Sequence, residues 1–275
     1  MKRVVLGCCI AVCAAALAGA QGFGQGGFGR MRREPPRFPG PDSFNGSFNF
    51  CRGMYTSDRP ENGGTGWWTD YPGADINFSI RLSELTKIRV GKQPDGTPDH
   101  LVVRLTDDAL FQCPYLEMED VGTMRLTDTE VVRLREYLLK GGFLYVDDFW
   151  GEWAWEQWTE EIGRVLPPKE YPIVDLTPNH PLFHAMFTVP GVPQVSSIQF
   201  WRRSGGLTSE RGDESAQPHI RGISDTRGRL MVVMTHDTDI SDTWEREGED
   251  PTYFNLFSPK GYALGINILL YALTH

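Results

Sequence analysis

The chain of 275 residues is 40% apolar and 12% aromatic, and its net charge is −9. This composition supports a large buried core and excludes a wholly disordered chain. The negative charge disfavours nucleic acid and anionic lipid as partners, because the long-range field of the protein repels both.

The N-terminus is typical of a signal peptide. Lys2 and Arg3 precede an apolar run over residues 4–17, and residues 18–20 are the small ones at which such a peptide is cut. Because the run is on the short side for a bilayer-spanning helix, we favour cleavage over a retained anchor. We therefore predict a signal peptide at residues 1–20, export to the periplasm or beyond, and no membrane span in the mature chain.

Residues 21–46 are rich in Gly, Pro and Arg and contain few groups that a core could bury. We predict a disordered tether here, followed by a single α/β domain over residues 47–275. The domain retains Cys51 and Cys113. They form either one disulfide, which export permits, or two buried thiols, and two cysteines alone make no zinc site.

Short β-branched runs alternate with helical patterns from Phe48 onward. Strands are expected within residues 48–57, 100–105, 115–119, 143–148, 171–176, 219–225 and 229–237. Helices are expected from Ala74 and within residues 126–142, 150–166 and 261–275. Such alternation predicts a mostly parallel sheet with helices on both faces. The last helix is apolar all round and too short to span a bilayer, so we expect it to be buried.

Asp147 and Asp148 end the strand expected over residues 143–148. Ligands of open parallel sheets bind outside the carboxyl ends of the strands. Because neighbouring side chains of a strand point opposite ways, one of the two should reach this edge or cap the next helix. Two carboxylates this close can split their pKa values or share a cation. Alternatively, one caps the helix and the other bonds a neighbouring loop.

Four tryptophans follow within residues 150–158. On a helix, Trp155 and Trp158 share the arc of the later apolar residues, which is typical of a core. Trp150 and Trp153 fall outside that arc and beside the aspartates. They either contact a sugar ring or a protein loop, or are covered by an N-terminal loop of the chain itself.

Two further acidic segments lie near predicted strand ends or helix starts. The first contains His236, Asp237, Asp239 and Asp242. This spacing can hold a divalent ion, or it forms a polar loop. The second contains Asp70, Asp75 and Arg81, in a loop that opens a helix. Aspartates at such a position usually cap the helix.

No G-x-S-x-G or cysteine elbow follows an expected strand in the sequence, and no phosphate-binding glycine loop opens a helix after one. We therefore assign no catalytic residue and predict neither a cofactor nor a metal.

Several segments together resemble a bacterial family, the domain of unknown function 4159. They are "DYPGADINFSIRLSELT", "PYLEME", "GGFLYVDDFWG", "HPLFH", "DISDTWE" and "LGINILLYALT". The resemblance implies the class I glutamine amidotransferase-like fold, a three-layer flavodoxin-like α/β sandwich, and brings no established activity. Relatives of that fold carry a cysteine at the elbow where this sequence has Asp147 and Asp148, so glutamine hydrolysis is not expected.

These observations predict an exported protein of the bacterial cell envelope with a non-catalytic domain that binds an envelope protein or a glycan. The predicted ligand-binding residues are Asp75, Arg81, Asp147, Asp148, Trp150, Trp153, His236 and Asp237. The alternative is a carboxylate- or metal-dependent hydrolase that acts on an envelope or glycan substrate.

Overall fold

The computed structural model describes residues 34–61 and 63–275. Residues Pro36–His275 form one compact unit. The predicted signal peptide at residues 1–20, and residues 21–33 of the predicted tether, lie outside the described residues.

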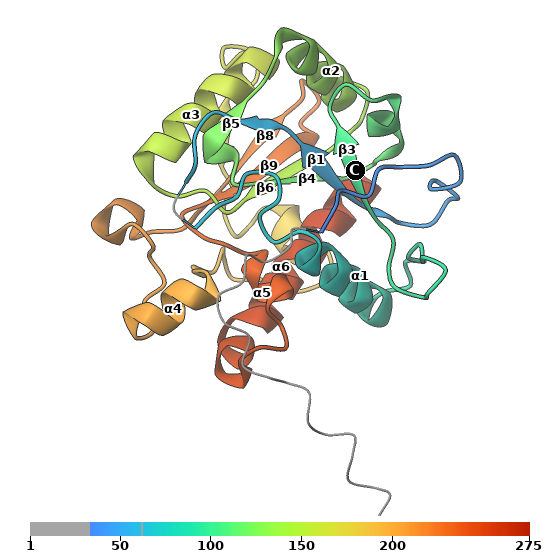
Figure 1. The fold of residues 1–275 in the computed structure, drawn as a ribbon. Coiled ribbons are helices and arrows are strands. Elements are labelled where there is room, and N and C mark those ends of the chain that lie inside the picture. Colours follow the sequence, from blue (N-terminus) through green and yellow to red (C-terminus); the bar gives the residue numbers. More distant parts are fainter. Residues whose placement is uncertain (1–33, 62) are drawn as a thin grey trace, which may run out of the picture. The chain divides into compact units, whose positions relative to one another are not determined.

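A central sheet of seven strands carries the fold (Figure 1). In spatial order it contains β3 (His100–Arg104), β1 (Phe50–Met54), β4 (Leu116–Glu119), β6 (Leu144–Asp147), β9 (Leu230–His236), β8 (His219–Ser224) and β7 (Ile173–Asp175). The first five are parallel to one another, and β8 is antiparallel to both of its neighbours. A separate antiparallel pair joins β2 (Thr56–Ser57) to β5 (Met124–Arg125). The prediction of an α/β protein with a mostly parallel sheet is therefore confirmed.

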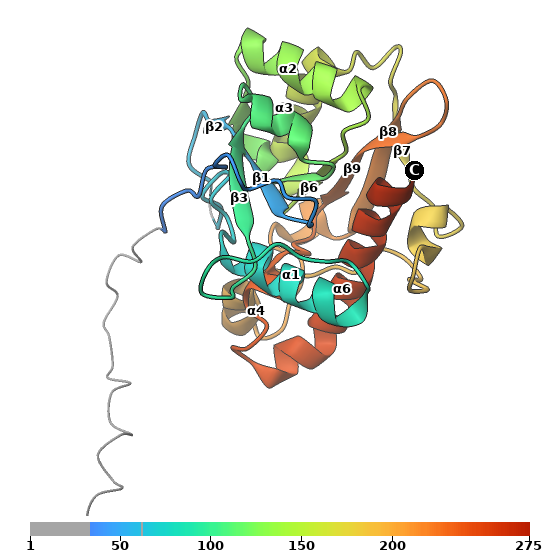
Figure 2. The ribbon, with the colours of Figure 1, turned by 90° about the vertical axis from the view of Figure 1, so that its right-hand side faces the viewer.

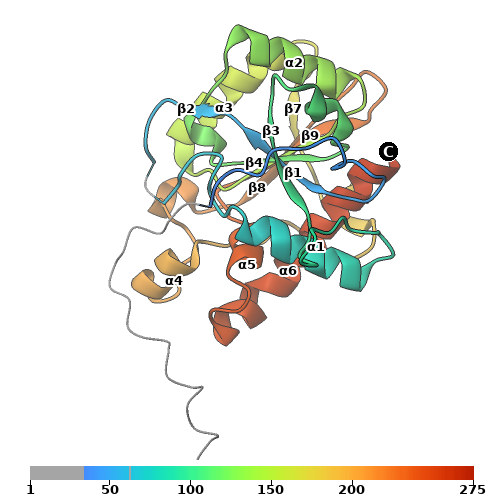
Figure 3. The same cartoon turned by 45° about the vertical axis from the view of Figure 1, so that its right-hand side comes forward.

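Helices cover both faces of the sheet (Figures 1 and 2). One face packs against α1 (Gly73–Leu85), α5 (Asp242–Glu245) and α6 (Pro251–Thr274), and the other against α2 (Asp128–Leu139) and α3 (Gly151–Val165). The alternation of β6 explains the two cores, because Tyr145 joins the first and its neighbours Leu144 and Val146 join the second. The short helix α4 (Ile198–Ser204) lies next to α5 (Figures 1 and 3). Four 3-10 helices complete the described elements: η1 (Asp108–Gln112), η2 (Val121–Thr123), η3 (Pro181–His184) and η4 (Gly212–Ser215).

The helix α2 begins and ends where the sequence predicts. Thr127 caps it through a capping box, in which its hydroxyl accepts from the backbone N–H of Glu130 and the Glu130 carboxylate accepts from the backbone N–H of Thr127. Gly141 follows with a φ of 110°, which a side chain would make costly.

The compact unit begins earlier than predicted, since residues 36–46 belong to it rather than to a tether. Arg37 Nε contacts Asp99 Oδ1 at 2.8 Å, and the guanidinium of Arg104 stacks 3.7 Å from the ring centre of Phe38. Composition could not reveal this, because the residues that anchor the segment lie next to and within β3.

The C-terminal helix also starts earlier, at Pro251 instead of Gly261. Asp250 fixes the start, because its carboxylate accepts from the backbone N–H groups of Thr252 and Tyr253. Over residues 34–61 and 63–275, no helix is both long enough and apolar enough to cross a membrane.

The two cysteines of the domain form a disulfide. Cys51 in β1 is bonded to Cys113, which follows η1, with an S–S distance of 2.05 Å, and both residues are buried. Of the two states that the sequence left open, the structure therefore contains the disulfide.

Candidate functional site

Three neighbouring strands of the sheet are each followed directly by an aspartate in the left-handed backbone conformation. Asp120 follows β4, Asp148 follows β6 and Asp237 follows β9, and their φ values are 51°, 52° and 60°. This left-handed conformation is rare outside glycine, and aspartate is one of the few other residues that tolerate it. The three residues therefore place acidic groups at the carboxyl edge of the sheet.

A cavity of 580 Å³ lies at this edge, which is where open parallel sheets bind ligands. Its wall combines the segment before α1, the turns after β4 and β6, the α4 region and the loop after β9. Seven carboxylates line it: Glu61, Asp70, Asp120, Asp148, Glu210, Asp239 and Asp242. The other charged or aromatic lining residues are Arg203, Arg211, Arg246, Trp150 and Phe200. The wall is therefore strongly acidic.

Asp148 and Asp239 are deeply buried in this wall, with exposures of only 8% and 2%. Asp148 Oδ1 accepts a hydrogen bond from Trp150 Nε1 at 2.8 Å, and Asp239 Oδ1 accepts one from the backbone N–H of Asp242 at 2.8 Å. The second oxygen of each carboxyl group has no hydrogen-bond partner among the described residues. Two acceptor oxygens on largely buried side chains therefore remain available to a ligand.

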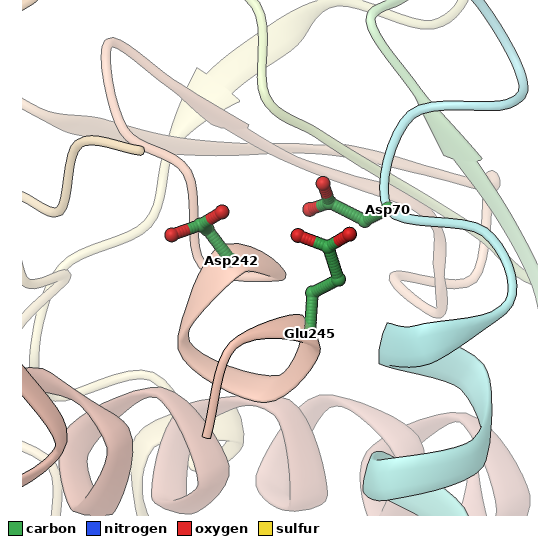
Figure 4. Close-up of side chains that lie close together, drawn as sticks. All are labelled: Asp70, Asp242 and Glu245. Carbon is green, nitrogen blue, oxygen red and sulfur yellow. The ribbon is translucent and has the colours of Figure 1, made fainter. Parts of the chain in front are cut away.

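Beside them, Asp70, Asp242 and Glu245 point their carboxyl groups toward one another (Figure 4). One oxygen from each lies within 4.8 Å of the other two. Asp242 is held in place, because its Oδ2 accepts from the Ile198 backbone N–H at 2.8 Å and from the Tyr253 hydroxyl at 2.9 Å. Asp70 Oδ2 is buried and, over the described part of the chain, has no hydrogen-bond partner.

Burial raises the pKa of these carboxyl groups, and their mutual repulsion raises it further. The pKa of Asp70, Asp148 and Asp239 lies well above the usual value, and that of Asp242 is raised to about 7. Because each ionised carboxylate destabilises the next, a cation that enters the cavity relieves the repulsion.

A further carboxyl pair lies in the wall at the turn after β4. Asp120 Oδ2 accepts from the backbone N–H of Gly66 at 2.7 Å. Burial, and after it the neighbouring carboxylate of Glu61, raise the pKa of Asp120 to about 7. Glu61 also contacts Arg211, at 3.4 Å. Asp120 can therefore take up or release a proton near neutral pH.

A buried network of charges involves the same strands. Arg52 is fully buried and contacts three carboxylates, those of Asp75, Glu117 and Glu119. Its Nη1 also donates to the carbonyl of Thr69 at 3.0 Å, and Thr69 lines the cavity. Arg52 therefore ties the sheet both to α1 and to the loop that carries Asp70.

Asp147 belongs to this network rather than to the cavity. It is fully buried, and its Oδ2 accepts from both the backbone N–H and the hydroxyl of Ser241, at 2.8 and 3.0 Å. Thr235 donates to its other oxygen. Burial raises the pKa of Asp147 to about 6 and that of Glu117 to about 7. The adjacent aspartates of the sequence thus separate as predicted, one into the interior and one toward the edge.

Of the predicted ligand-binding residues, Asp148 and Trp150 line the cavity together. Asp75 is fully buried against Arg52, and Arg81 on α1 pairs with Glu247. Neither is among the residues that line the cavity. Their predicted part in binding stays a prediction.

Trp153 lies away from the cavity. It is 66% exposed on α3, and the guanidinium of Arg59 stacks 3.9 Å from its ring centre. Trp158 is fully buried, as the helical arc predicts, whereas Trp155 is only partly buried, under the guanidinium of Arg221 at 4.3 Å.

His236 and Asp237, at the end of β9 and directly after it, contact the first residue of α3. Asp237 Oδ1 accepts from the backbone N–H of Gly151 at 2.8 Å, and His236 Nε2 lies 3.1 Å from the Gly151 carbonyl. The His236 ring packs beside Phe149 and Trp155, and burial lowers its pKa to about 4. The imidazole is therefore neutral at physiological pH and acts as a packing group.

The predicted set omitted Asp70, Asp120, Asp239, Asp242 and Glu245. Three of them, Asp70, Asp239 and Asp242, stand in the acidic segments of the sequence. Asp120 carried a usable signal as well, because it directly follows an expected strand. Glu245 carried none, since a glutamate in "DTWERE" resembles any solvated helix residue.

Comparison with known proteins supplies a family but no activity. A family model described as a domain of unknown function, DUF4159, matches residues 58–273. No curated protein matches the chain. The match begins directly after β2, ends near the end of α6 and includes every residue that lines the cavity. The chain therefore belongs to the DUF4159 family.

Proposed function

We propose that this protein is a non-catalytic ligand-binding domain of an exported bacterial envelope protein. The observation that carries the proposal is the pair Asp148 and Asp239, which are nearly fully buried and keep one carboxylate oxygen each without a hydrogen-bond partner among the described residues. Unpaired buried carboxyl groups cost stability. A ligand that supplies hydrogen-bond donors or positive charge accounts for their presence.

The charge of the wall indicates the class of ligand. Seven carboxylates face three arginines, so the cavity favours a ligand with a protonated amino group. Trp150 and Phe200 add apolar surface beside the charges. An envelope glycan with amino groups, or a lysine-containing segment of an envelope protein, has this chemistry.

The class I glutamine amidotransferase-like sandwich is the fold that we propose for the domain. The five parallel strands and the helices on both faces support it. The turn after β6, where relatives of that fold carry a nucleophilic cysteine, holds Asp148 here. Among the described residues that line the cavity there is neither a cysteine nor a histidine. The Ser197 hydroxyl donates a hydrogen bond to Glu210 Oε1 at 2.7 Å, so its partner is a carboxylate and not the imidazole of a Ser–His pair. Binding is therefore favoured over nucleophilic catalysis.

One observation favours the alternative, a carboxylate- or metal-dependent hydrolase. Asp120 has a pKa of about 7 beside Glu61, which suits a general acid–base pair. Hydrolysis of an envelope glycan by the wild-type protein, lost in Asp120→Asn, would favour that alternative.

Export is supported by two features. The first 20 residues have the pattern of a signal peptide. The Cys51–Cys113 disulfide suits an oxidising compartment.

The test is a binding titration with a matched pair of glycans, a glucosamine trimer and its N-acetylated counterpart, and with a lysine-containing peptide. We expect the amine-bearing ligands to bind and the acetylated trimer not to bind. Asp148→Asn should weaken binding at least about tenfold, as loss of a buried charged partner does.

Glu170→Gln is the matched control, because Glu170 is exposed and does not line the cavity. Equal affinity for both trimers, or binding that Asp148→Asn leaves intact, would contradict the proposal.

A further inference from the structure

We infer that Asp70, Asp242 and Glu245 form a binding site for a hard divalent cation, Ca²⁺ in the first place. The site shares the cavity of the proposed function, and the inference deepens that proposal by naming an inorganic ligand. It concerns residues outside the predicted set.

The spacing of the three carboxyl groups suits such an ion. Ca²⁺ binds oxygen ligands at about 2.3–2.6 Å, so two ligands on opposite sides of the ion are about 5 Å apart. One oxygen of each of the three residues lies within 4.8 Å of the other two. A single ion can therefore contact all three without a change of backbone (Figure 4).

Independent observations point to a missing ligand. Asp70 Oδ2 is buried without a hydrogen-bond partner in the described part of the chain. In the same cavity, Asp148 and Asp239 are 8% and 2% exposed, and one oxygen of each also lacks a partner there. The deeper pair can bind water molecules of the ion's coordination sphere.

The carboxylates around the three-residue cluster are not fully neutralised by neighbouring arginine side chains. Arg246 contacts Glu245 and lies 3.8 Å from Asp242, and it also contacts Glu249 at 2.8 Å. One guanidinium shared by three carboxylates cannot neutralise the cluster. When the ion binds, Arg246 keeps Glu249 as its partner, so the guanidinium of Arg246 is not left without a carboxylate.

The donor atoms decide the class of metal. All three side chains offer carboxylate oxygens, which suit Ca²⁺, Mg²⁺ and Mn²⁺, whereas Zn²⁺ favours nitrogen and sulfur donors. Mg²⁺ demands a near-ideal octahedron, and Ca²⁺ accepts irregular sets of ligands. A loop aspartate combined with two helix carboxylates is such an irregular set.

The experiment is a calorimetric titration of the purified, EDTA-treated protein with CaCl₂, MgCl₂ and ZnCl₂, together with thermal unfolding. We expect one Ca²⁺ per chain, a higher Tm with Ca²⁺, and a Ca²⁺ affinity at least equal to that for Mg²⁺. Asp70→Asn and Glu245→Gln should each weaken Ca²⁺ binding by about 10–100-fold or more, the loss known even for groups outside the coordination sphere.

Both substituted residues are partly exposed, so we expect the variants to fold, and far-UV circular dichroism checks this. Glu170→Gln should bind Ca²⁺ like the wild type. No binding of Ca²⁺, binding of Zn²⁺ alone, or full affinity in both variants would overturn the inference.

The glucosamine trimer titrated in the presence of EDTA separates the two proposals. If the trimer binds and Ca²⁺ does not, only the cation site is refuted. If Ca²⁺ binds and no amine-bearing ligand does, the proposed function fails and the cation site stands.

Discussion

The two tryptophans Trp158 and Trp153 give the sharpest contrast between packing and surface on α3. Trp158 is fully buried between α3 and the sheet, and its Nε1 lies 3.2 Å from Met234 Sδ. Burying roughly 150–250 Å² of aromatic surface at about 25 cal/mol per Å² contributes about 4–6 kcal/mol. Measured truncations of this kind cost about 3–5 kcal/mol, which we expect for Trp158→Ala.

Trp153 is the matched control, because it is 66% exposed and stacks on Arg59. An exposed cation–π pair contributes about 0.5–1 kcal/mol, so Trp153→Ala should lower the free energy of unfolding by no more than that. Urea unfolding of both variants, followed by far-UV circular dichroism, measures the two values side by side. If Trp153→Ala proved as destabilising as Trp158→Ala, the division of α3 into a core face and a surface face would be wrong.

Three further predictions concern the interior. Replacing both Cys51 and Cys113 by serine should lower the free energy of unfolding by about 2–4 kcal/mol, because the disulfide closes a loop across a sequence separation of 62 residues; unchanged stability would contradict this. Burial raises the pKa of Glu117 from 4.5 to about 7, so its contribution to stability is fully present below pH 4.5 and is lost as the pH rises through 7. Between pH 4.5 and a pH above 7, the free energy of unfolding should fall by an amount on the order of 3 kcal/mol because of Glu117, and Glu117→Gln should reduce this fall. An equal dependence of the free energy of unfolding on pH in the variant would argue against the raised pKa of Glu117. Arg52→Met leaves Asp75 buried without its partner and should cost about 3–5 kcal/mol in urea unfolding, so a loss below about 1 kcal/mol would refute the role of Arg52.

Local signals in the sequence predicted the elements well, because the forces that start and end them are local. The capping box of Thr127 and Glu130 and the left-handed Gly141 bound α2 within its own few residues. The same holds for the alternation of β6, which separates Asp147 from Asp148. Where anchors are distant in sequence, prediction failed, as with Arg37, whose partner Asp99 lies 62 residues further on.

The candidate site was only partly predictable for the same reason. Its wall brings Asp70 next to Asp242 and Glu245, which no local pattern relates. His236 and Asp237 stand at a strand end as well, but they contact Gly151 at the start of α3, and their part in binding stays a prediction. A strand end places a residue at the correct edge of the sheet, and the turn that follows decides which way its side chain points.

The central claim is that Asp148 is kept for binding rather than for folding. Asparagine also tolerates a φ of 52° and retains the oxygen that accepts from Trp150 Nε1, so Asp148→Asn removes the ionisable carboxyl group and changes little else. The most direct measurement combines urea unfolding of this variant at neutral pH with titration of the glucosamine trimer. We predict a free energy of unfolding equal to or above that of the wild type, together with weakened binding, which is the trade-off expected of a binding site. Lower stability with unchanged binding would show that Asp148 serves the fold, and would contradict the account.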